Sequence, residues 1–198
     1  MIPRRLIRVV PEKTTDQVER WWAEACDLHP DWEHVTLRDP IDPELFPRTH
    51  DLWPTCKSGA QLADLVRIEE LCRRGGVYID SDVEVYRPFD PLLVNEGFAA
   101  YDCPDFIPNA VLGFRPWHPA LIDVLALARE RHHIGTWDSG VYVTTEVFRD
   151  RDDMLLLPPG AFYPVFWRHK NLVDWPSVEK ENPWAFCAHH ANHSWEGT

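Results

Sequence analysis

The stretch LCRRGGVYIDSDVEVY, residues 71–86, places two carboxylates inside an apolar run and decides how the rest of the chain is interpreted. Its β-branched side chains predict one strand over residues 77–86. In an extended strand, Asp80 and Asp82 would project to the same side, about 6.6 Å apart. Burying carboxylates is costly unless they are paired or bound to a cation. The spacing therefore suits a hard divalent cation, Mg²⁺ or Mn²⁺, although a strand that runs into a polar turn gives the same pattern.

The composition is that of an acidic globular protein, with 198 residues, 44% hydrophobic residues and a formal net charge of -12. This length predicts a single domain over residues 1–198. Because an acidic surface repels phosphate backbones, nucleic-acid binding is disfavoured. Five cysteines without a CxxC pair favour reduced thiols and a cytoplasmic location. The opening residues do not resemble a signal peptide, and no apolar run approaches the roughly 20 residues of a membrane span.

Apolar periodicity on both sides of the quoted stretch predicts helices that alternate with strands. Ser58 and Gln61 form a capping box at the start of the clearest helix, and Gly75 and Gly76 end it. A surface loop rich in proline and aromatic residues is expected over residues 39–57. The alternation favours an α/β layered fold with a mixed sheet. The expected strands cover residues 5–10, 34–40, 97–103 and 109–116, and the expected helices cover residues 15–28, 58–76 and 118–133.

The helix over residues 58–76 carries an acid on its apolar side. On a helical wheel, Asp64 falls inside the broad face of leucine, valine and isoleucine side chains, and Arg67 lies at the edge of that face. Two interpretations stay open. Asp64 and Arg67 form a local ion pair three residues apart, or both point to a ligand that is held where this helix meets the next strand.

These motifs follow one another at fixed intervals in ADLVRIEELCRRGGVYIDSDVEVYRPFDPLL, residues 63–93. The ordered string resembles the family 32 glycosyltransferases, which contain a D-x-D sugar-binding region, and the glucosyltransferase domains of large clostridial cytotoxins. The resemblance is strong over residues 58–93 and moderate in IPRRLIRVV, NAVLGFRPWHPALIDVL and AHHANHSW. Together these segments cover a little more than half of the chain.

The resemblance implies a GT-A-like nucleotide-diphospho-sugar transferase fold, with a mixed central sheet flanked by helices. It also implies a nucleotide-sugar donor, a UDP-sugar being the expected one, and a Mn²⁺ or Mg²⁺ ion. The implied metal ligands are Asp80, Asp82 and His189. The implied catalytic residues are Asp64, Arg67, Asp80 and Asp82. The implied donor-binding residues are Asp64, Arg67, Gly76, Tyr78, Asp80, Asn109, Ser194 and Trp195.

The C-terminal CAHHANHSW resembles a family ending in which a histidine precedes Ser-Trp by a few residues. His189 is the better match for the histidine on the metal side, and His190 is the alternative. The same residues could also be a surface tail. A zinc site from His189 and His193 is disfavoured, because no cysteine lies near them in the sequence.

The chain departs from the family pattern at two places. The opening Ile-Pro is usually followed by a histidine and by a tryptophan that stacks on the nucleotide base, but these positions hold Ile7 and Val10. The usual Thr-Gly-Pro stretch is missing, and Gly140 in WDSGVYVTTEVF is its one clear counterpart. The chain is also short for the fold. We therefore expect base recognition by other residues, and an acceptor site that is minimal or supplied by a partner.

The sequence as a whole favours a metal-dependent retaining glycosyltransferase that moves a hexose to a glycan or protein acceptor. No nucleophile is evident, which favours a front-face displacement through an ion-pair-like state. Two alternatives stay open. One is a non-catalytic relic of the fold that binds nucleotide sugars or glycans. The other, which the acidic charge balance opposes, is a metal-dependent phosphohydrolase.

Overall fold

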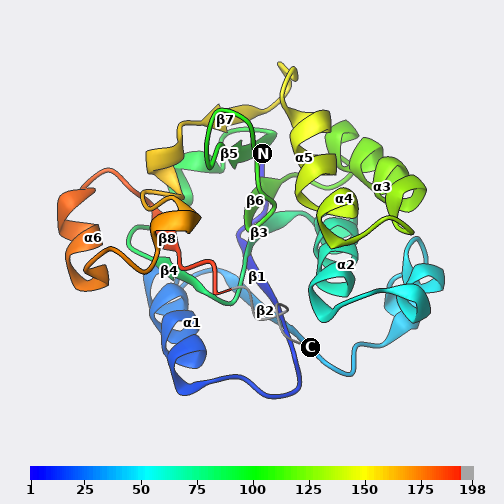
Figure 1. The fold of residues 1–198 in the computed structure, drawn as a ribbon, viewed down its shortest axis with the longest axis horizontal. Helices are drawn as coiled ribbons and strands as arrows, with labels where there is room; N and C mark the ends of the chain where they lie inside the picture. The colour runs from blue at the N-terminus through cyan, green and yellow to red at the C-terminus, as the bar shows by residue number, and fades with distance from the viewer. Residues whose placement is uncertain (193–198) are drawn as a thin grey trace.

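The computed structural model describes residues 1–192, and a mixed sheet of six strands forms its centre (Figure 1). The strand order is β2-β1-β3-β6-β5-β7. Parallel pairs join β2 to β1, β1 to β3 and β5 to β7, whereas β6 is antiparallel to both β3 and β5. The predicted mixed sheet is thus confirmed. The strands are β1 (Arg5–Val10), β2 (Glu33–Arg38), β3 (Gly76–Ile79), β5 (Gly97–Ala100), β6 (Val111–Phe114) and β7 (Leu155–Leu157).

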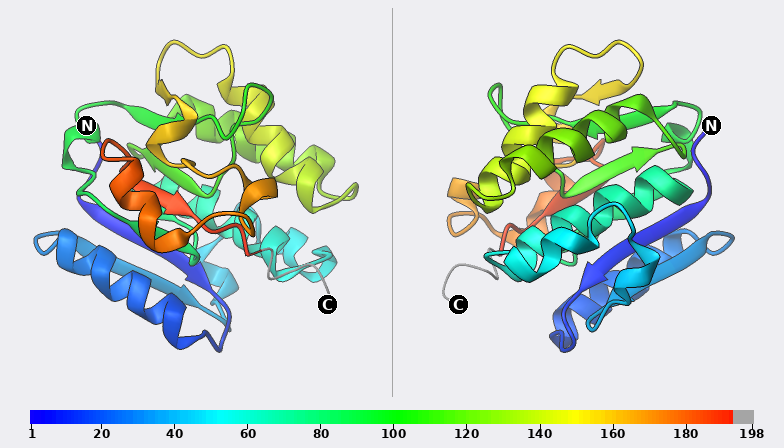
Figure 2. Two further views of the ribbon diagram at one scale, coloured as in Figure 1. Left: turned by 60° about the vertical axis from the view of Figure 1, so that its left-hand side comes forward. Right: turned by 90° about the vertical axis from the view of Figure 1, so that its right-hand side faces the viewer.

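Helices cover both faces of this sheet, because successive side chains of its central strands are buried on opposite sides. Leu6 and Val77 pack toward α1, while Ile7 and Tyr78 pack toward α2 and α3. Figure 2 shows α2 and α3 together in front of the strands in its right-hand view. The helices are α1 (Asp16–Leu28), α2 (Gly59–Arg74), α3 (Pro119–Arg131), α4 (Thr136–Ser139), α5 (Val141–Phe148) and α6 (Trp175–Glu181).

Helix α2 begins and ends close to the residues that the sequence predicts. The Ser58 hydroxyl accepts the backbone N–H of Gln61 at 3.1 Å, as in a capping box. The Gln61 side chain, however, accepts the backbone N–H of Lys57 rather than that of Ser58. At the other end Gly75 has φ +67°, and a Cβ there would lie 2.8 Å from the Phe114 carbonyl oxygen. Glycine is therefore needed where α2 turns into β3.

The order of the parallel strands reverses at β1. The connection through α1 places β2 on one side of β1, and the connection through α2 places β3 on the other side. Ligands of open α/β sheets bind at the carboxyl ends of the strands where the order reverses in this way. Asp80 follows directly after β3, so it lies at this end of the sheet.

The prediction of one continuous strand over residues 77–86 is wrong. Strand β3 ends at Ile79, the chain turns through Asp80 to Asp82, and β4 (Val83–Val85) begins a second sheet. There β4 pairs antiparallel with β8 (Cys187–His189), and Val83 lies opposite His189. The apolar pattern of the sequence does not reveal the turn, because Val83 and Val85, which follow the turn, are buried like the residues of β3.

The region over residues 39–57 contains short helical turns rather than a plain surface loop. Phe46 is only 1% exposed, and the Thr49 hydroxyl donates to Glu69 of α2 at 2.7 Å. Among residues 1–192, no helix is both long enough and apolar enough to cross a membrane. The 3-10 turns of the chain are η1 (Pro43–Leu45), η2 (His50–Thr55), η3 (Asp90–Leu92), η4 (Pro159–Ala161) and η5 (Trp167–His169).

Candidate active site

The turn between the two sheets brings Asp80, Asp82 and His189 together. The Asp80 backbone N–H donates to the Ala110 carbonyl at 2.8 Å, which ties the start of the turn to the loop before β6. The His189 Nε2 lies 3.2 Å from Asp82 Oδ1 and 4.0 Å from Asp80 Oδ2. One ligand atom from each of the three residues lies within 4.8 Å of the others. Within the described residues, this is the one group of three or more acidic, histidine or cysteine side chains close enough to share a metal ion.

His189, and not His190, lies beside the two aspartates. The His190 ring is stacked between Trp21 at 4.2 Å and Trp175 at 3.8 Å between ring centroids. Its Nε2 lies 3.0 Å from Glu84 Oε2. His190 still supports the turn, because its backbone N–H donates to the Asp82 carbonyl at 3.0 Å.

The charges of this cluster are strongly coupled. Burial would raise the pKa of the Asp82 carboxyl, but His189 and the backbone N–H of Asn192 hold that pKa well below its usual range. Burial would lower the pKa of the His189 imidazole, but Asp82, Asp80 and Asp102 raise it above its ordinary value. The aspartates therefore attract positive charge to the point where they meet His189.

This donor set fits a divalent cation. Two carboxylates and one imidazole can neutralise and coordinate such an ion, and the coupled charges already favour a cation there. Mg²⁺ prefers oxygen ligands alone, whereas first-row transition ions accept imidazole nitrogen as well. The presence of His189 in the set is therefore compatible with a first-row transition ion.

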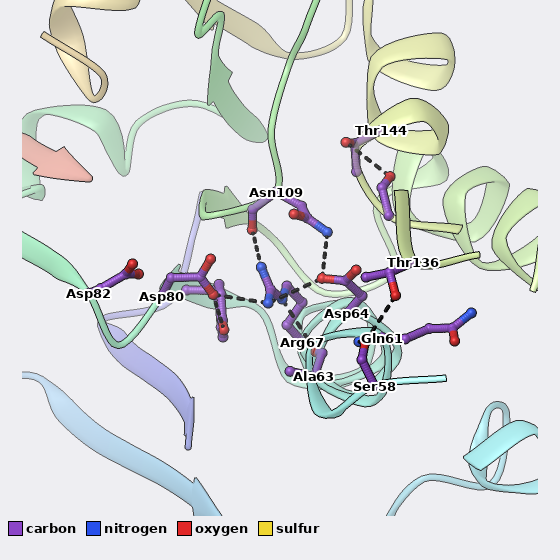
Figure 3. A network of polar contacts seen from close by, with 12 residues as sticks. Ser58, Gln61, Ala63, Asp64, Arg67, Asp80, Asp82, Asn109, Thr136 and Thr144 are labelled. Atoms are coloured by element: carbon purple, nitrogen blue, oxygen red, sulfur yellow. Dashed lines mark hydrogen bonds and ion pairs between the residues drawn. The ribbon is translucent and has the colours of Figure 1, made fainter. Parts of the chain in front are cut away.

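Arg67 connects this cluster to a buried acid on α2 (Figure 3). Its Nη2 lies 2.9 Å from Asp80 Oδ1 and 3.2 Å from Asp64 Oδ1. Its Nη1 donates to the Asn109 carbonyl at 2.9 Å, and its Nε donates to the Ala63 carbonyl. Arg67 is only 4% exposed, so these contacts fix its guanidinium. The predicted local ion pair with Asp64 exists, and the same guanidinium also reaches Asp80.

Asp64 is held in place by Arg67 of its own helix and by Asn109. Its Oδ1 accepts the Asn109 side-chain amide at 2.9 Å in addition to its contact with Arg67. Burial raises the pKa of Asp64 to about 6, although Arg67 opposes the shift. The other oxygen, Oδ2, faces Gly140 at the start of α5. Figure 3 shows Asp82, Asp80, Arg67 and Asp64 in one row, with Asn109 above Arg67 and Asp64.

We expect Gly140→Ala to lower any activity of the site about tenfold or more. A Cβ at this position would collide with Asp64 Oδ2 and would lie 2.9 Å from the Thr136 carbonyl oxygen. Because Asp64 is held by Arg67 and Asn109, it can move only by breaking those contacts, and displacements of about 1 Å can cost up to 100-fold. Gly59→Ala is the control, since a Cβ there meets nothing within 4 Å. Equal turnover of both variants and wild type would show that Gly140 does not position Asp64.

Two other predicted residues, Tyr78 and Gly76, belong to β3. Tyr78 is fully buried, its hydroxyl donates to Asp80 Oδ1 at 2.7 Å, and Arg67 lies 4.5 Å above its ring. It therefore holds Asp80 and Arg67, and a direct contact with a donor stays a prediction. Gly76 begins β3 at the end opposite Asp80, where a Cβ would lie 2.8 Å from the Arg5 carbonyl oxygen. Backbone packing explains this glycine, and its donor-binding role also stays a prediction.

Two residues near His189, Asp102 and Tyr163, are not predicted from the sequence. Asp102 follows β5, burial raises its pKa to about 6, and His189 opposes that shift. The Tyr163 ring packs edge-on against His189, with 6.0 Å between the centroids. Asp102 comes two residues after the end of β5, and an acid so close to a strand end is a sequence signal for a site residue, whereas nothing local distinguishes Tyr163 from other core aromatics. Ser194, Trp195 and His193 lie outside the described residues.

Residues 11–99 match the family described as "Glycosyltransferase sugar-binding region containing DXD motif". The match contains the α2 helix with Asp64 and Arg67 and the turn with Asp80 and Asp82. Asn109 and His189 lie beyond it.

Curated relatives with this similarity are larger proteins. Inositol phosphoceramide mannosyltransferase 3 of Schizosaccharomyces pombe is 35% identical over 123 residues, which are 57% of this chain and 34% of that protein. Mannosyl phosphorylinositol ceramide synthase SUR1 of Saccharomyces cerevisiae is 33% identical over 132 residues, which are 63% of this chain and 34% of that protein. The matched part thus spans about a third of each relative.

Solved structures extend the similarity to the whole fold. PaToxG glycosyltransferase aligns with a TM-score of 0.61 at 16% identity, over 74% of this chain and 68% of that one. The apo-form glycosyltransferase GlyE of Streptococcus pneumoniae aligns with a TM-score of 0.61 at 13% identity, over 100% of this chain and 56% of that one. The chain therefore has a GT-A-like fold, as the sequence predicts.

Proposed function

We propose that this chain is a metal-dependent retaining glycosyltransferase of the family 32 type, related to the glucosyltransferase domains of large clostridial cytotoxins. It would move a hexose from a nucleotide-sugar donor, with a UDP-sugar as the expected donor, to a glycan or protein acceptor. The observation that carries the proposal is the row in which Arg67 joins the metal-type cluster of Asp80, Asp82 and His189 to the buried Asp64. One of the two relatives is named a mannosyltransferase and the other a mannosyl phosphorylinositol ceramide synthase, so mannose is included among the sugars to be tested.

The proposed division of labour follows from the geometry. Asp80, Asp82 and His189 would hold Mn²⁺ or Mg²⁺, and that ion would supply positive charge against a diphosphate without a proton donor. Asp64 and Asn109 would bind hydroxyl groups of the hexose, since Asp64 keeps one carboxylate oxygen outside its contacts with Arg67 and Asn109. Arg67 would fix the relative positions of Asp64 and Asp80, because its guanidinium contacts both.

The proposed reaction exchanges one bond for another at the anomeric carbon. The bond from that carbon to the diphosphate oxygen breaks, and its electron pair stays on the diphosphate. The acceptor oxygen forms the new bond on the same face, and its proton passes to an oxygen of the departing diphosphate. Retention then needs no enzyme nucleophile, and the buried carboxylate of Asp64 already has Arg67 and Asn109 as partners.

Thermal unfolding in the presence of nucleotide sugars tests the proposal. UDP- and GDP-linked glucose, galactose, mannose and N-acetylglucosamine are each added with and without Mn²⁺. We expect one donor to raise the melting temperature only when Mn²⁺ is also present, and we expect slow release of free sugar from that donor. Stabilisation without sugar release would favour the binding relic, and phosphate release from simple phosphate esters would favour the phosphohydrolase.

Two further statements remain predictions of this proposal. The first is that residues 1–198 form one catalytic domain, which is expected from the chain length. The second is a cytoplasmic location, which is expected from the number and spacing of the cysteines.

A further inference from the structure

The positive groups of the candidate site are paired with acidic side chains of the site itself. Arg67 uses its guanidinium on Asp64, Asp80 and two backbone carbonyls. A divalent cation between Asp80 and Asp82 would be balanced by those two carboxylates. The ion would then compensate the charge of a bound diphosphate only in part, in a chain whose net charge is -12. A second positive group near the diphosphate would therefore strengthen donor binding.

The segment after η5 places an ammonium group beside the site. The Lys170 Nζ donates to the carbonyl of Ala191. Ala191 stands between two residues that contact Asp82, because the His190 N–H donates to the Asp82 carbonyl and the Asn192 N–H donates to Asp82 Oδ2 at 2.7 Å. The ammonium of Lys170 thus binds the residue between His190 and Asn192, whose backbone N–H groups both donate to Asp82.

A separate contact fixes the same segment. The Trp175 Nε1 donates to the Lys170 carbonyl at 3.1 Å, and the Trp175 ring stacks on His190. Both ends of the segment therefore rest on residues 190 and 191. This anchoring lowers the entropy that a flexible lysine would lose on binding an anion.

Lys170 also has hydrogen-bonding capacity to spare. An ammonium group has three N–H donors, and one of them is used on Ala191. Within residues 1–192, no carboxylate forms an ion pair with Lys170, although most arginines near the sheet have such partners. Within the part of the chain that the structure describes, this half-buried lysine therefore has no acid partner and has donors to spare, which suits it to an anion.

We infer that Lys170 donates hydrogen bonds to the diphosphate of the nucleotide-sugar donor and stabilises the nucleoside diphosphate that leaves, an inference that rests on the proposed function. As the sugar bond breaks, its electron pair moves onto the diphosphate oxygen. An ammonium group beside that oxygen gains attraction as the negative charge grows. Lys170 is thereby a binding residue in addition to those that the sequence suggested.

The test measures how tightly the variants Lys170→Met and Lys170→Arg bind nucleoside diphosphates. Isothermal titration with UDP and GDP in the presence of Mn²⁺ is compared with titration of uridine and guanosine. For the diphosphate that wild type binds, we expect Lys170→Met to weaken binding about 10- to 100-fold, the range for a hydrogen bond to a charged group. The affinity for the matching nucleoside and for Mn²⁺ alone should not change, and Lys170→Arg should recover part of the loss.

Lys180→Met is the matched control, because it removes the same charge from the exposed side of α6. An equal loss in this control, or an equal loss for the nucleoside or for Mn²⁺ alone, would overturn the inference by showing a general charge effect or a structural role. If the Lys170→Met variant bound the diphosphate as tightly as wild type, the inference about Lys170 would be overturned and the proposed function would stand. A wild-type protein that binds neither diphosphate would overturn the proposed function and this inference with it.

Discussion

Replacing Asp82 with asparagine is expected to reduce sugar release from the donor about 100- to 1000-fold while the protein stays folded. Asparagine has the shape of aspartate, so the N–H of Asn192 can still find an oxygen acceptor at this position. The negative charge that faces His189 is lost, however, and with it half of the carboxylate charge available to a cation. The effect should therefore fall on the metal-dependent steps.

The measurement is the rate of sugar release as a function of Mn²⁺ concentration. We expect Asp82→Asn to require far more Mn²⁺ and to reach a lower plateau, with an unchanged far-ultraviolet circular dichroism spectrum. Glu84→Gln removes the same charge two residues away, where the side chain faces His190 rather than His189, and should keep near wild-type rates. If Asp82→Asn retained a normal Mn²⁺ response, the metal would have to bind elsewhere.

Local signals in the sequence were sufficient for the helix that carries half of the site. Ser58, Gln61 and Gly75 act within a few residues of their own positions, so the start and end of α2 could be predicted. The burial of Asp64 could be predicted as well, because helical periodicity depends only on neighbours along the chain.

The other half of the site depends on contacts between distant residues. Asp82 and His189 meet because β4 pairs with β8 about a hundred residues later, and no local pattern specifies that pairing. The turn at Asp80 was missed for the same reason, since it is defined by a change of sheet and not by a change in hydrophobicity. The choice between His189 and His190 required Trp21 and Trp175, which enclose His190 from two separate helices.

Arg67→Met should destabilise the fold by about 3–5 kcal/mol, the range for removing one partner of a buried ion pair, and should abolish donor binding. The guanidinium is 4% exposed and contacts both Asp64 and Asp80. Without it, two carboxylates remain close together without a permanent cation between them. Because Arg67 normally lowers the pKa of Asp64, its removal should raise that pKa above about 6.

The sign of the pH dependence follows from that shift. A carboxyl group whose pKa is higher in the folded state than in the unfolded state favours folding at low pH, and this contribution is lost as the pH rises through the folded value. The destabilisation by Arg67→Met should therefore be larger at pH 8 than at pH 6. Urea unfolding at both pH values measures it, provided that Mn²⁺ is absent.

The double variant Arg67→Met with Asp64→Asn separates the structural role of Arg67 from its proposed role in donor binding. Asparagine at position 64 removes one of the two uncompensated charges but can keep a contact with Asn109. The double variant should therefore be more stable than Arg67→Met alone, by a coupling energy of about 0.5–3 kcal/mol. Donor binding should stay absent, because the double variant restores neither the guanidinium nor the carboxylate that we propose to bind the sugar. A double variant that is no more stable than Arg67→Met would contradict the charge argument, and one that regains donor binding would remove Asp64 from the site.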